Sequence, residues 1–443
     1  MTTYTAYRAQ LLYFTGAPNL TLQSHETDPN VHFHADGLIV VEDDKICFAG
    51  EYQQGTEYLD ERTTLVDWRD KLITAGFIDS HVHYPQTDMI ASPAPDLLPW
   101  LENYTFPTEA ALNDYDHAKD VSEFFIQELL RQGTTTAMVY CTSHKNSVEA
   151  FFETSHAQNL RMIAGKVLMD QNCPEAIRDT AQGGIADSEN LLQKWHGTGR
   201  QLYALTPRFA PTSSREQLDG CAQLAKQYSD IYIQTHVAES KAEIAWVHSL
   251  FPEHNSYLDI YDHYGLLRPK AVYGHCIWFD ERDRARMRDT QSVAAHCPTS
   301  NFFLGSGLFS AKEAEAADML YSLATDVGAG TSFSLLATMN EAYKVARLQQ
   351  HYLPALQMFY LCTYGSAKAL QLEHQIGTLL PGHEADFVVL DPRATPLLAR
   401  RAEHYNSLEE MLFGLAMLGD DRAVYATVAG GKVVHQRSPH QTR

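Results

Sequence analysis

Short apolar runs alternate with longer amphipathic segments through the middle of the chain. Segments such as 122–131, 214–227 and 239–250 have the apolar spacing of helices, and the runs between such segments have the length of strands. This alternation predicts parallel strands joined by helices, and eight strands favour a closed (β/α)8 barrel of the TIM type. The predicted strands are residues 72–80, 134–140, 162–169, 202–206, 231–236, 271–275, 292–296 and 321–326.

An open, doubly wound sheet is the main alternative for the same alternation. That fold typically carries a Gly-x-Gly-x-x-Gly motif directly after its first strand. No such motif follows residue 80. We therefore favour the barrel and place it at residues 71–379.

The two ends of the chain show apolar runs that follow one another without long helical segments. Runs at 37–41 and 45–50 flank an acidic turn, and runs at 423–428 and 432–435 flank a Gly-Gly pair. Both patterns predict hairpins. We expect residues 1–70 and 380–443 to form one small β-sandwich domain. Within its C-terminal part, a strand at 385–390 and a helix at 407–418 are also predicted.

Composition narrows the range of partners. The 443 residues suffice for a barrel with additions, and 44% hydrophobic and 20% charged residues are ordinary for a globular protein. The net charge of −21 would repel nucleic acids and acidic membrane surfaces, so we expect neither as a partner. The same acidity also serves solubility.

Cysteine usage indicates a reducing compartment. The seven cysteines are scattered and form no Cys-x-x-Cys pair, which argues against a disulfide framework or a zinc ribbon. The first ten residues lack the basic and apolar regions of a signal peptide, and no apolar run reaches the length of a membrane span. We expect a soluble cytoplasmic protein.

Histidines and an aspartate recur where the predicted barrel strands end. His81 and His83 close the first strand, His236 the fifth, His275 the sixth, and Asp326 the eighth. In a barrel these strand ends surround one mouth. A single buried histidine is usually a hydrogen-bonded core residue, but that explanation does not suit several histidines at the same end of successive strands.

These residues predict a metal site. His81, His83, His236 and Asp326 would hold one divalent metal per subunit and leave a position for water, whose pKa falls toward ~7. His275 would hydrogen-bond this water, act as a fifth ligand, or stand outside the ligands. The ligand types alone do not separate zinc from iron, because imidazole and carboxylate suit both metals.

Glu239 is the candidate proton carrier. It follows His236 by three residues, so it would reach over the metal and move a proton from water to substrate. The alternative is an ordinary glutamate in the first turn of a helix, stabilised by the helix dipole.

The chain resembles the amidohydrolase superfamily in four features. These are the motif at 76–83, the histidines after strands five and six, Asp326, and the closing run 381–390. The resemblance covers nearly the whole chain, including the terminal strands. Ala75 departs from it, because the superfamily often has proline there, but this position lies outside the predicted ligands. The resemblance implies zinc at His81, His83, His236 and Asp326, and it implies a homodimer.

Within the superfamily, five runs resemble the guanine-deaminase subgroup: 83–86, 98–109, 207–209, 236–240 and 296–301. This resemblance implies hydrolysis of guanine to xanthine and ammonia, with a metal-bound hydroxide attacking C2. Asp326 would take the water proton or hold the hydroxide. Glu239 would protonate N3 and then help ammonia leave.

The same resemblance assigns a substrate pocket. Gln86 and Arg208 would hydrogen-bond the purine edge, whose O6 and N7 acceptors suit an amide or guanidinium, and Phe209 would help to form the base pocket. The alternatives are a surface salt bridge for Arg208 and a packed core ring for Phe209. Trp100, Tyr104 and Phe106 would form a wall or lid, or pack without such a role. Four residues at the mouth are also expected to contact substrate: His83, His236, Glu239 and Asp326.

Other functions remain as alternatives. Deaminases of other purines, of cytosine or of triazines share this scaffold. A two-metal hydrolase normally uses a lysine at the end of strand four, where this chain reads Thr206-Pro207-Arg208. The small zinc deaminases need a Pro-Cys-x-x-Cys motif, which this chain lacks. A non-catalytic scaffold protein is disfavoured because such proteins typically lose metal ligands.

Overall fold

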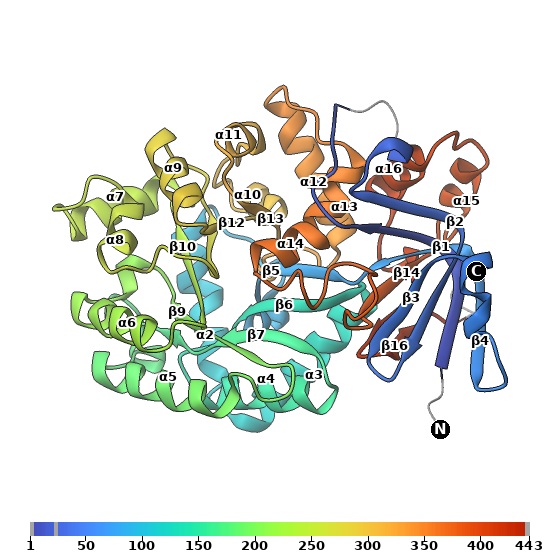
Figure 1. Ribbon diagram of the computed structural model, residues 1–443. Helices are drawn as coiled ribbons and strands as arrows, with labels where there is room; N and C mark the ends of the chain where they lie inside the picture. The colour runs from blue at the N-terminus through green and yellow to red at the C-terminus, as the bar shows by residue number, and fades with distance from the viewer. Residues whose placement is uncertain (1–3, 22–24, 439–443) are drawn as a thin grey trace.

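The computed structural model describes residues 4–21 and 25–438. The predicted terminal segments therefore include residues 1–3, 22–24 and 439–443, which lie outside the described part. Figure 1 shows a barrel of strands and helices on one side and a sheet built from both ends of the chain on the other. In the described part, no helix combines the length and the apolar character needed to cross a membrane.

The predicted barrel is confirmed. Its strands pair in parallel and in chain order, and a short strand, β8 (Val167–Leu168), pairs separately with β9. The barrel strands are β5 (Phe77–His83), β6 (Thr134–Tyr140), β7 (Arg161–Gly165), β9 (Leu202–Pro207), β10 (Tyr232–Val237), β11 (Ala271–His275), β12 (Val293–His296) and β13 (Tyr321–Leu323).

Helices surround these strands. Most begin at a serine, threonine or aspartate whose side chain accepts a hydrogen bond from the first turn, as at Asp114 before α3 and Ser214 before α6. The longer outer helices are α3 (Tyr115–Arg131), α4 (Lys145–Ala157), α5 (Ala181–Trp195), α6 (Arg215–Gln227), α7 (Lys241–Leu250), α8 (Tyr257–His263), α9 (Glu281–Asp289), α12 (Leu335–Leu348) and α13 (Ala355–Leu361). Shorter ones are α1 (Leu97–Trp100), α2 (Phe106–Ala111), α10 (Pro298–Phe303), α11 (Ala311–Ala316) and α14 (Tyr364–Ala369). A further helix, α15 (Pro396–Ala402), packs against the helix that follows it in the chain.

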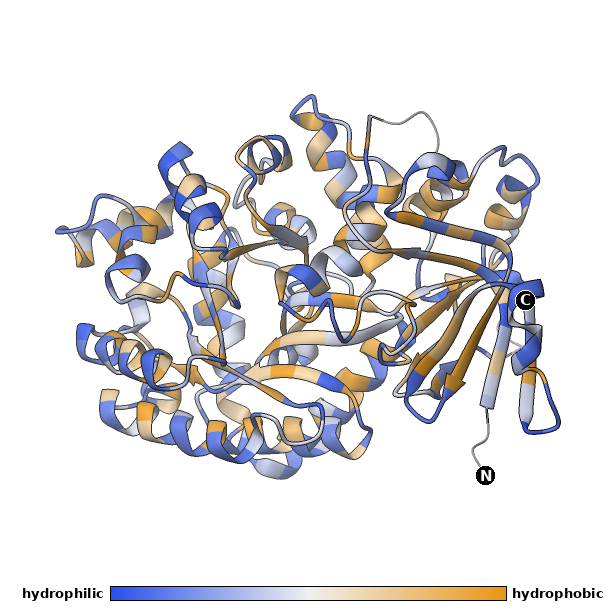
Figure 2. Cartoon of the chain, in the orientation of Figure 1, coloured by the Kyte–Doolittle hydropathy of each residue, from blue (hydrophilic) through white to orange (hydrophobic). Residues whose placement is uncertain are grey.

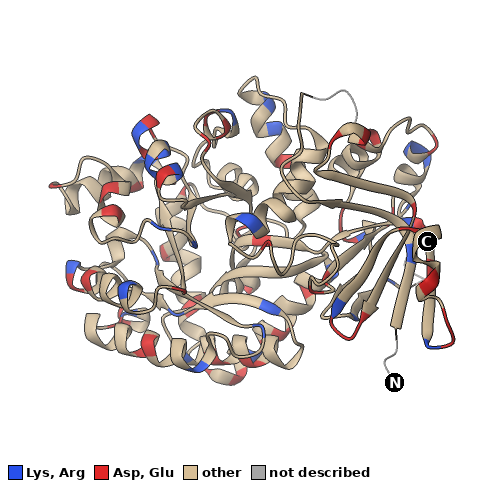
Figure 3. Ribbon diagram, in the orientation of Figure 1, with Lys and Arg blue, Asp and Glu red and all other residues tan. Residues whose placement is uncertain are grey.

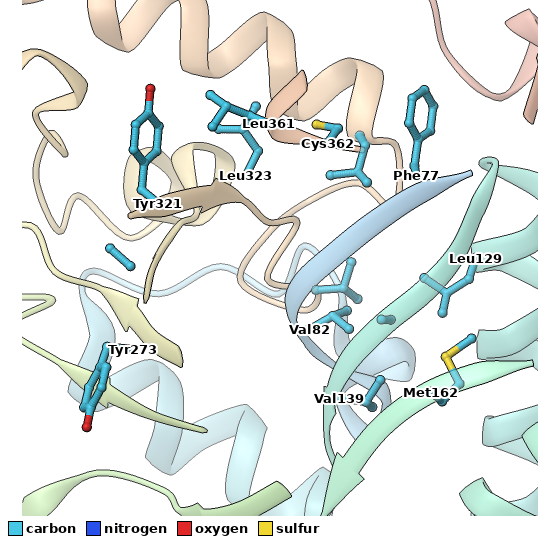
Figure 4. Packing of buried hydrophobic residues seen from close by; sticks show 14 of the residues in the cluster. Phe77, Val82, Leu129, Val139, Met162, Tyr273, Tyr321, Leu323, Leu361 and Cys362 are labelled. Carbon is cyan, nitrogen blue, oxygen red and sulfur yellow. The ribbon is translucent and has the colours of Figure 1, made fainter. Parts of the chain in front are cut away.

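Two apolar layers hold the barrel together. One cluster lies inside the barrel. Each barrel strand, or the residue directly after it, contributes a side chain to this cluster, beginning with Ile78, Met138 and Ile163. The helix α14 adds Ala367. A second, larger cluster lies between strands and helices and includes Val82, Val139 and Leu129, drawn in Figure 4. The helices carry one apolar and one polar stripe, as Figure 2 shows, and most charged residues lie on helices and loops (Figure 3).

The barrel is closed by contacts between β5 and the segment that follows β13. The backbone N–H of Asp326 donates to His81 O at 3.0 Å, and His83 N–H donates to Val327 O at 2.8 Å. The buried carboxylate of Asp79 accepts hydrogen bonds from the N–H of Thr325, at 3.1 Å, and from its hydroxyl. The first and eighth strands are therefore joined at the mouth by backbone and side-chain bonds.

The ends of the chain form the expected separate β structure. Its strands make one mixed sheet in the order β16-β15-β14-β4-β1-β2-β3, and Tyr7, Ile39 and Phe387 belong to a cluster that is the core of this sheet. The predicted helix near residue 407 is α16 (Leu408–Leu418), which packs on α12 and α13. The strands are β1 (Tyr4–Phe14), β2 (Val31–Glu42), β3 (Lys45–Glu51), β4 (Thr63–Ala75), β14 (Phe387–Leu390), β15 (Val424–Ala429) and β16 (Lys432–Gln436).

The prediction of one barrel strand over residues 72–80 is wrong. Residues 72–75 end β4 and pair with β1 and β14 of the terminal sheet, whereas β5 begins at Phe77 and pairs with β6. Gly76 separates the two strands at a close approach, since a Cβ there would lie 2.1 Å from Thr135 Oγ1. A continuous apolar run does not reveal where a chain leaves one sheet for another. The eighth strand is also shorter than predicted and ends at Leu323.

A buried cluster of ion pairs joins the barrel to the terminal sheet. Arg161 begins β7 and Arg200 precedes β9, and both guanidinium groups bind the carboxylate of Glu384, with Nε–Oε2 distances of 2.8 and 3.0 Å. Arg200 also pairs with Asp386, which accepts the N–H of Gly430 at 2.7 Å. These charges satisfy one another at the start of the barrel strands, at the end opposite to the mouth.

Replacement of Glu384 by alanine is expected to destabilise the protein by about 3–5 kcal/mol, because two buried arginines lose their shared acceptor. Urea unfolding followed by circular dichroism measures this loss. Glu403→Ala is the matched control, since Glu403 makes only an exposed pair with Arg400 and its loss should cost at most about 1 kcal/mol.

The pH dependence gives this prediction a second signature. Burial alone would raise the pKa of Glu384, but hydrogen bonds and charge from Arg161 and Arg200 outweigh burial and lower it. The stabilisation is therefore complete above the ordinary pKa of 4.5 and is lost as the pH falls through the lower folded-state value. Equal stability of the Glu384→Ala and Glu403→Ala variants at neutral pH would contradict the prediction.

Candidate active site

Four of the predicted ligands meet at the mouth of the barrel. His81 Nε2 and His83 Nε2 lie 3.3 and 3.4 Å from Asp326 Oδ1. His236 Nε2 lies 3.3 Å from His83 Nε2. Two overlapping groups of these side chains have the spacing of metal ligands: His81 with His83 and His236, and His81 with His275 and Asp326.

A β-bulge aims the first two histidines into the mouth. Ile78 points into the barrel core, and strict alternation along β5 would turn His81 and His83 to the opposite face. The pairing of β5 with β6 shifts register between Asp79 and Val82, which brings both imidazoles above Ile78. Gly274 in β11 leaves room for His81, because a Cβ there would lie 2.6 Å from His81 Cε1.

The protonation states of the cluster suit metal ligands. His236 Nδ1 donates to the carbonyl of Arg208 at 2.7 Å, so its Nε2 presents a lone pair to the centre. Burial lowers the pKa of His83 to about 4 and that of His236 well below its ordinary value. Burial would raise the pKa of Asp326, but the adjacent histidines outweigh burial and hold it well below its ordinary value. His83 and His236 therefore present neutral imidazoles beside the ionised carboxylate of Asp326.

The spacing of the ligand atoms agrees with donors that share one metal ion. Two donor atoms that are each about 2.0–2.1 Å from a zinc ion lie at most about 4 Å apart. The three separations given above, 3.3, 3.4 and 3.3 Å, meet this limit. The residues present therefore fit a divalent metal in both chemistry and spacing.

Glu239 lies beside the cluster and is almost fully buried. Its Oε1 accepts a hydrogen bond from Ser306 at 2.8 Å, and its Oε2 lies 3.4 Å from His275 Nε2. Burial and then the charge of Asp326 raise the pKa of Glu239 to about 8. The alternative of a first-turn helix glutamate is wrong, because Ser240 is the N-cap of α7 and Glu243 fills the capping box.

His275 faces both carboxylates. Its Nδ1 lies 2.8 Å from Asn301 Oδ1, which leaves Nε2 directed between Glu239 and Asp326, the latter at 3.7 Å. His275 and Asp326 both have left-handed backbone angles, with φ of +75° and +51°. Residues other than glycine rarely hold this conformation, and such strain is concentrated at functional sites.

One pocket is lined both by members of the cluster and by apolar side chains. A mostly apolar lining with a few polar groups is typical of a site for a small molecule. Polar residues line one part of the wall and apolar residues the rest. The lining residues are His83, Gln86, Leu97, Trp100, Leu101, Arg208, Phe209, His236, Glu239, Glu243, His275, Leu304, Asp326 and Ala329.

The structure brings Gln86, Arg208, Phe209 and Trp100 to this pocket. Arg208 makes no surface salt bridge, because it is buried and its Nη1 donates to Glu109 at 2.6 Å. Phe209 lines the pocket and also packs edge-on against Trp246, so the ring is both part of the pocket wall and part of the core packing.

The remaining aromatic candidates, and the strand-end histidine His296, lie outside the pocket lining. The ring centroid of Phe106 lies 5.5 Å from the guanidinium carbon of Arg208. Phe106 belongs to an apolar cluster with Trp100 and Leu101, and Tyr104 packs against that cluster. His296, at the end of the seventh strand, stacks on Phe309 at 4.6 Å.

Sequence reasoning missed two polar residues of the site, Glu109 and Ser306. Glu109 lies in the run 98–109 that carried the resemblance, but no spacing marked it as a partner of Arg208. Ser306 lies in a loop after α10 and donates to Glu239 across 67 positions of sequence. Neither contact leaves a local pattern in the chain.

A profile of the amidohydrolase family matches residues 72–434. The chain belongs to the amidohydrolase family. The match begins before the first barrel strand and ends in β16, so it spans the whole barrel of this amidohydrolase.

This amidohydrolase is similar in sequence and structure to several guanine deaminases. The guanine deaminase of Escherichia coli (strain K12) is 47% identical over 408 residues, which are 92% of this chain and 93% of that protein. A solved structure of E. coli guanine deaminase superposes with a TM-score of 0.94 at 44% identity, covering 98% of this chain and 100% of that one. The guanine deaminase of C. acetobutylicum, with guanine bound in its active site, gives 0.86 at 26% identity over 98% and 100%. The predicted resemblance is confirmed.

Replacement of His83 by alanine is expected to abolish metal binding. Loss of a direct ligand should cost more than the roughly 10–100-fold in affinity that loss of an outer partner costs. Metal content after dialysis, measured by inductively coupled plasma mass spectrometry, checks this. His296→Gln is the matched control, since His296 is a buried strand-end histidine outside the cluster. Full metal content in His83→Ala would show that this cluster is not the metal site.

Proposed function

We propose that this amidohydrolase is a guanine deaminase that hydrolyses guanine to xanthine and ammonia. One observation carries the proposal: a single pocket is lined by Glu239, by most of the His/Asp cluster and by the buried Gln86 and Arg208. The identity of 47% with the E. coli enzyme supports the same substrate.

We propose that His81, His83, His236 and Asp326 hold one zinc ion per subunit. Their separations and charge states, given above, support this set. When bound, such a metal supplies a Lewis acid that lowers the pKa of water toward ~7. Iron is the alternative, because the same ligand types suit it, and analysis of the native metal separates the two.

The pocket would recognise the purine through its polar edge. Arg208 and Gln86 carry N–H donors that match the O6 and N7 acceptors of guanine. Phe209 and Trp100 would cover the ring faces, because both line the cavity. This arrangement would direct C2, which carries the amino group, toward the cluster of histidines.

Glu239, Asp326 and His275 would move the protons of the reaction. The oxygen of water adds to C2 while Asp326 accepts a water proton and Glu239 donates a proton to N3. Glu239, now ionised, would take the proton of the new C2 hydroxyl and deliver it to the 2-amino group, so that the C2–N bond breaks, ammonia leaves and C2=O remains. Asp326 would then pass the water proton to Glu239, which restores both carboxyl groups. His275 would hold the attacking water, since its Nε2 faces both carboxylates.

We further propose that the enzyme works in the cytoplasm as a homodimer. The family resemblance supports the dimer. The scattered cysteines, all seven of them free thiols, suit a reducing compartment.

Purified, zinc-loaded protein is expected to release ammonia from guanine and to form xanthine. Adenine, cytosine and 8-oxoguanine are the comparison substrates, each followed by ammonia release and ultraviolet absorbance. Guanine should exceed the other bases by at least about 100-fold in kcat/KM, because mispaired polar groups in a buried pocket are costly. Turnover of another base alone would overturn the substrate assignment and leave the metal site standing.

Glu239→Gln is expected to lower kcat by about 10²–10⁴-fold while metal content stays at the wild-type level, because the amide cannot carry the proton. Steady-state ammonia release and metal analysis on the same sample check this. Glu216→Gln is the matched control, since Glu216 is an ordinary exposed glutamate in the first turn of α6. Unchanged turnover in Glu239→Gln would exclude the proposed role.

A further inference from the structure

Glu109 is a fully buried carboxylate at the back of the pocket, in α2. Its Oε1 accepts a hydrogen bond from Gln86 Nε2 at 3.0 Å, and its Oε2 accepts one from Arg208 Nη1 at 2.6 Å. A single carboxylate therefore binds both side chains that face the purine edge. The mechanism proposed above does not use it.

These bonds determine which way the Gln86 amide points. Its Oε1 accepts the backbone N–H of Gly328 at 3.1 Å, while its Nε2 donates to Glu109. A flipped amide would direct its NH₂ at the N–H of Gly328 and its carbonyl at the carboxylate of Glu109. One contact would then join two donors and the other would join two acceptors, so Glu109 and Gly328 together select one orientation of the amide.

The same carboxylate orients and neutralises Arg208. Among the described residues, Glu109 is the side chain that hydrogen-bonds the guanidinium, which also lies over the ring of Phe106. The buried pair carries no net charge, so the pocket presents N–H donors without an uncompensated cation. This arrangement suits a neutral base.

We infer that Glu109 is the positioning residue that makes this pocket selective for 6-oxopurines over 6-aminopurines. The inference rests on the proposed function. A 6-oxopurine presents the acceptor O6 beside the donor N1–H, whereas a 6-aminopurine presents a donor beside an acceptor. With Glu109 in place, Arg208 and Gln86 Nε2 offer donors, which pair with O6 and oppose a 6-amino group. Without it, only the N–H of Gly328 holds the Gln86 amide, so a turned amide that accepts from a 6-amino group costs less than in the wild type.

The test measures binding to zinc-loaded protein by calorimetry, with hypoxanthine and adenine as probes. Hypoxanthine keeps the 6-oxo edge but has no 2-amino group to be hydrolysed, so its binding is read without turnover. In the wild type, hypoxanthine should bind more tightly than adenine. In Glu109→Gln the ratio of the two dissociation constants should fall at least 10-fold, because the new amide cannot accept from both partners. Guanine turnover should show a raised KM with a smaller change in kcat.

Two further variants keep the test decisive if Glu109→Gln folds poorly. Glu109→Asp keeps a charge near Arg208, but its side chain is one methylene too short to bind both partners, so selectivity should fall while the melting temperature stays close to wild type. Glu102→Gln is the matched control, since Glu102 is an exposed glutamate on the same segment. It should leave both binding constants unchanged.

The outcomes separate the two proposals. If wild-type protein releases no ammonia from guanine, the proposed function fails, whatever the variants do. If wild-type protein deaminates guanine but both Glu109 variants keep the wild-type ratio of hypoxanthine to adenine binding, the role of Glu109 is overturned. An equal loss of affinity for both probes also overturns it, because that result indicates a merely structural role.

Discussion

The site depends on the closure of the barrel between its first and eighth strands. Two backbone hydrogen bonds and the buried carboxylate of Asp79 join β5 to the segment after β13. Because of that junction, Asp326 lies within 3.4 Å of two histidines from the other end of the barrel sequence. The only anionic member of the proposed ligand set would be missing if these strands stayed apart.

Burial organises the charges of the site into two compensated groups. The candidate metal cluster combines the ionised carboxylate of Asp326 with His83 and His236, whose pKa values are lowered by burial, and the proposed base-recognition side pairs Arg208 with Glu109. Charges that are buried in this way must be paired or must bind a metal, since bare ions are costly to desolvate. The pocket thus separates a polar centre suited to water activation from a neutral wall suited to an uncharged base.

Much of the fold was predictable because it follows from local periodicity. Alternating strand and helix patterns identified the barrel, and parallel strands of a barrel end at one mouth, so His81, His83, His236, His275 and Asp326 were expected together. The errors also have physical causes. The run 72–80 spans two sheets, since an apolar pattern is the same in both, and the start of α7 falls after Glu239 because Ser240 caps it.

The sequence by itself determined which residue types end each strand, which segments are helical, and which family the chain resembles, because these properties depend on neighbouring residues. Only the tertiary structure decided the bulge that turns His81 and His83 inward, the room that Gly274 leaves, and the bond between Glu109 and Arg208 across 99 positions. Such contacts join distant segments, and their geometry depends on how strands register and pack, which no local pattern records.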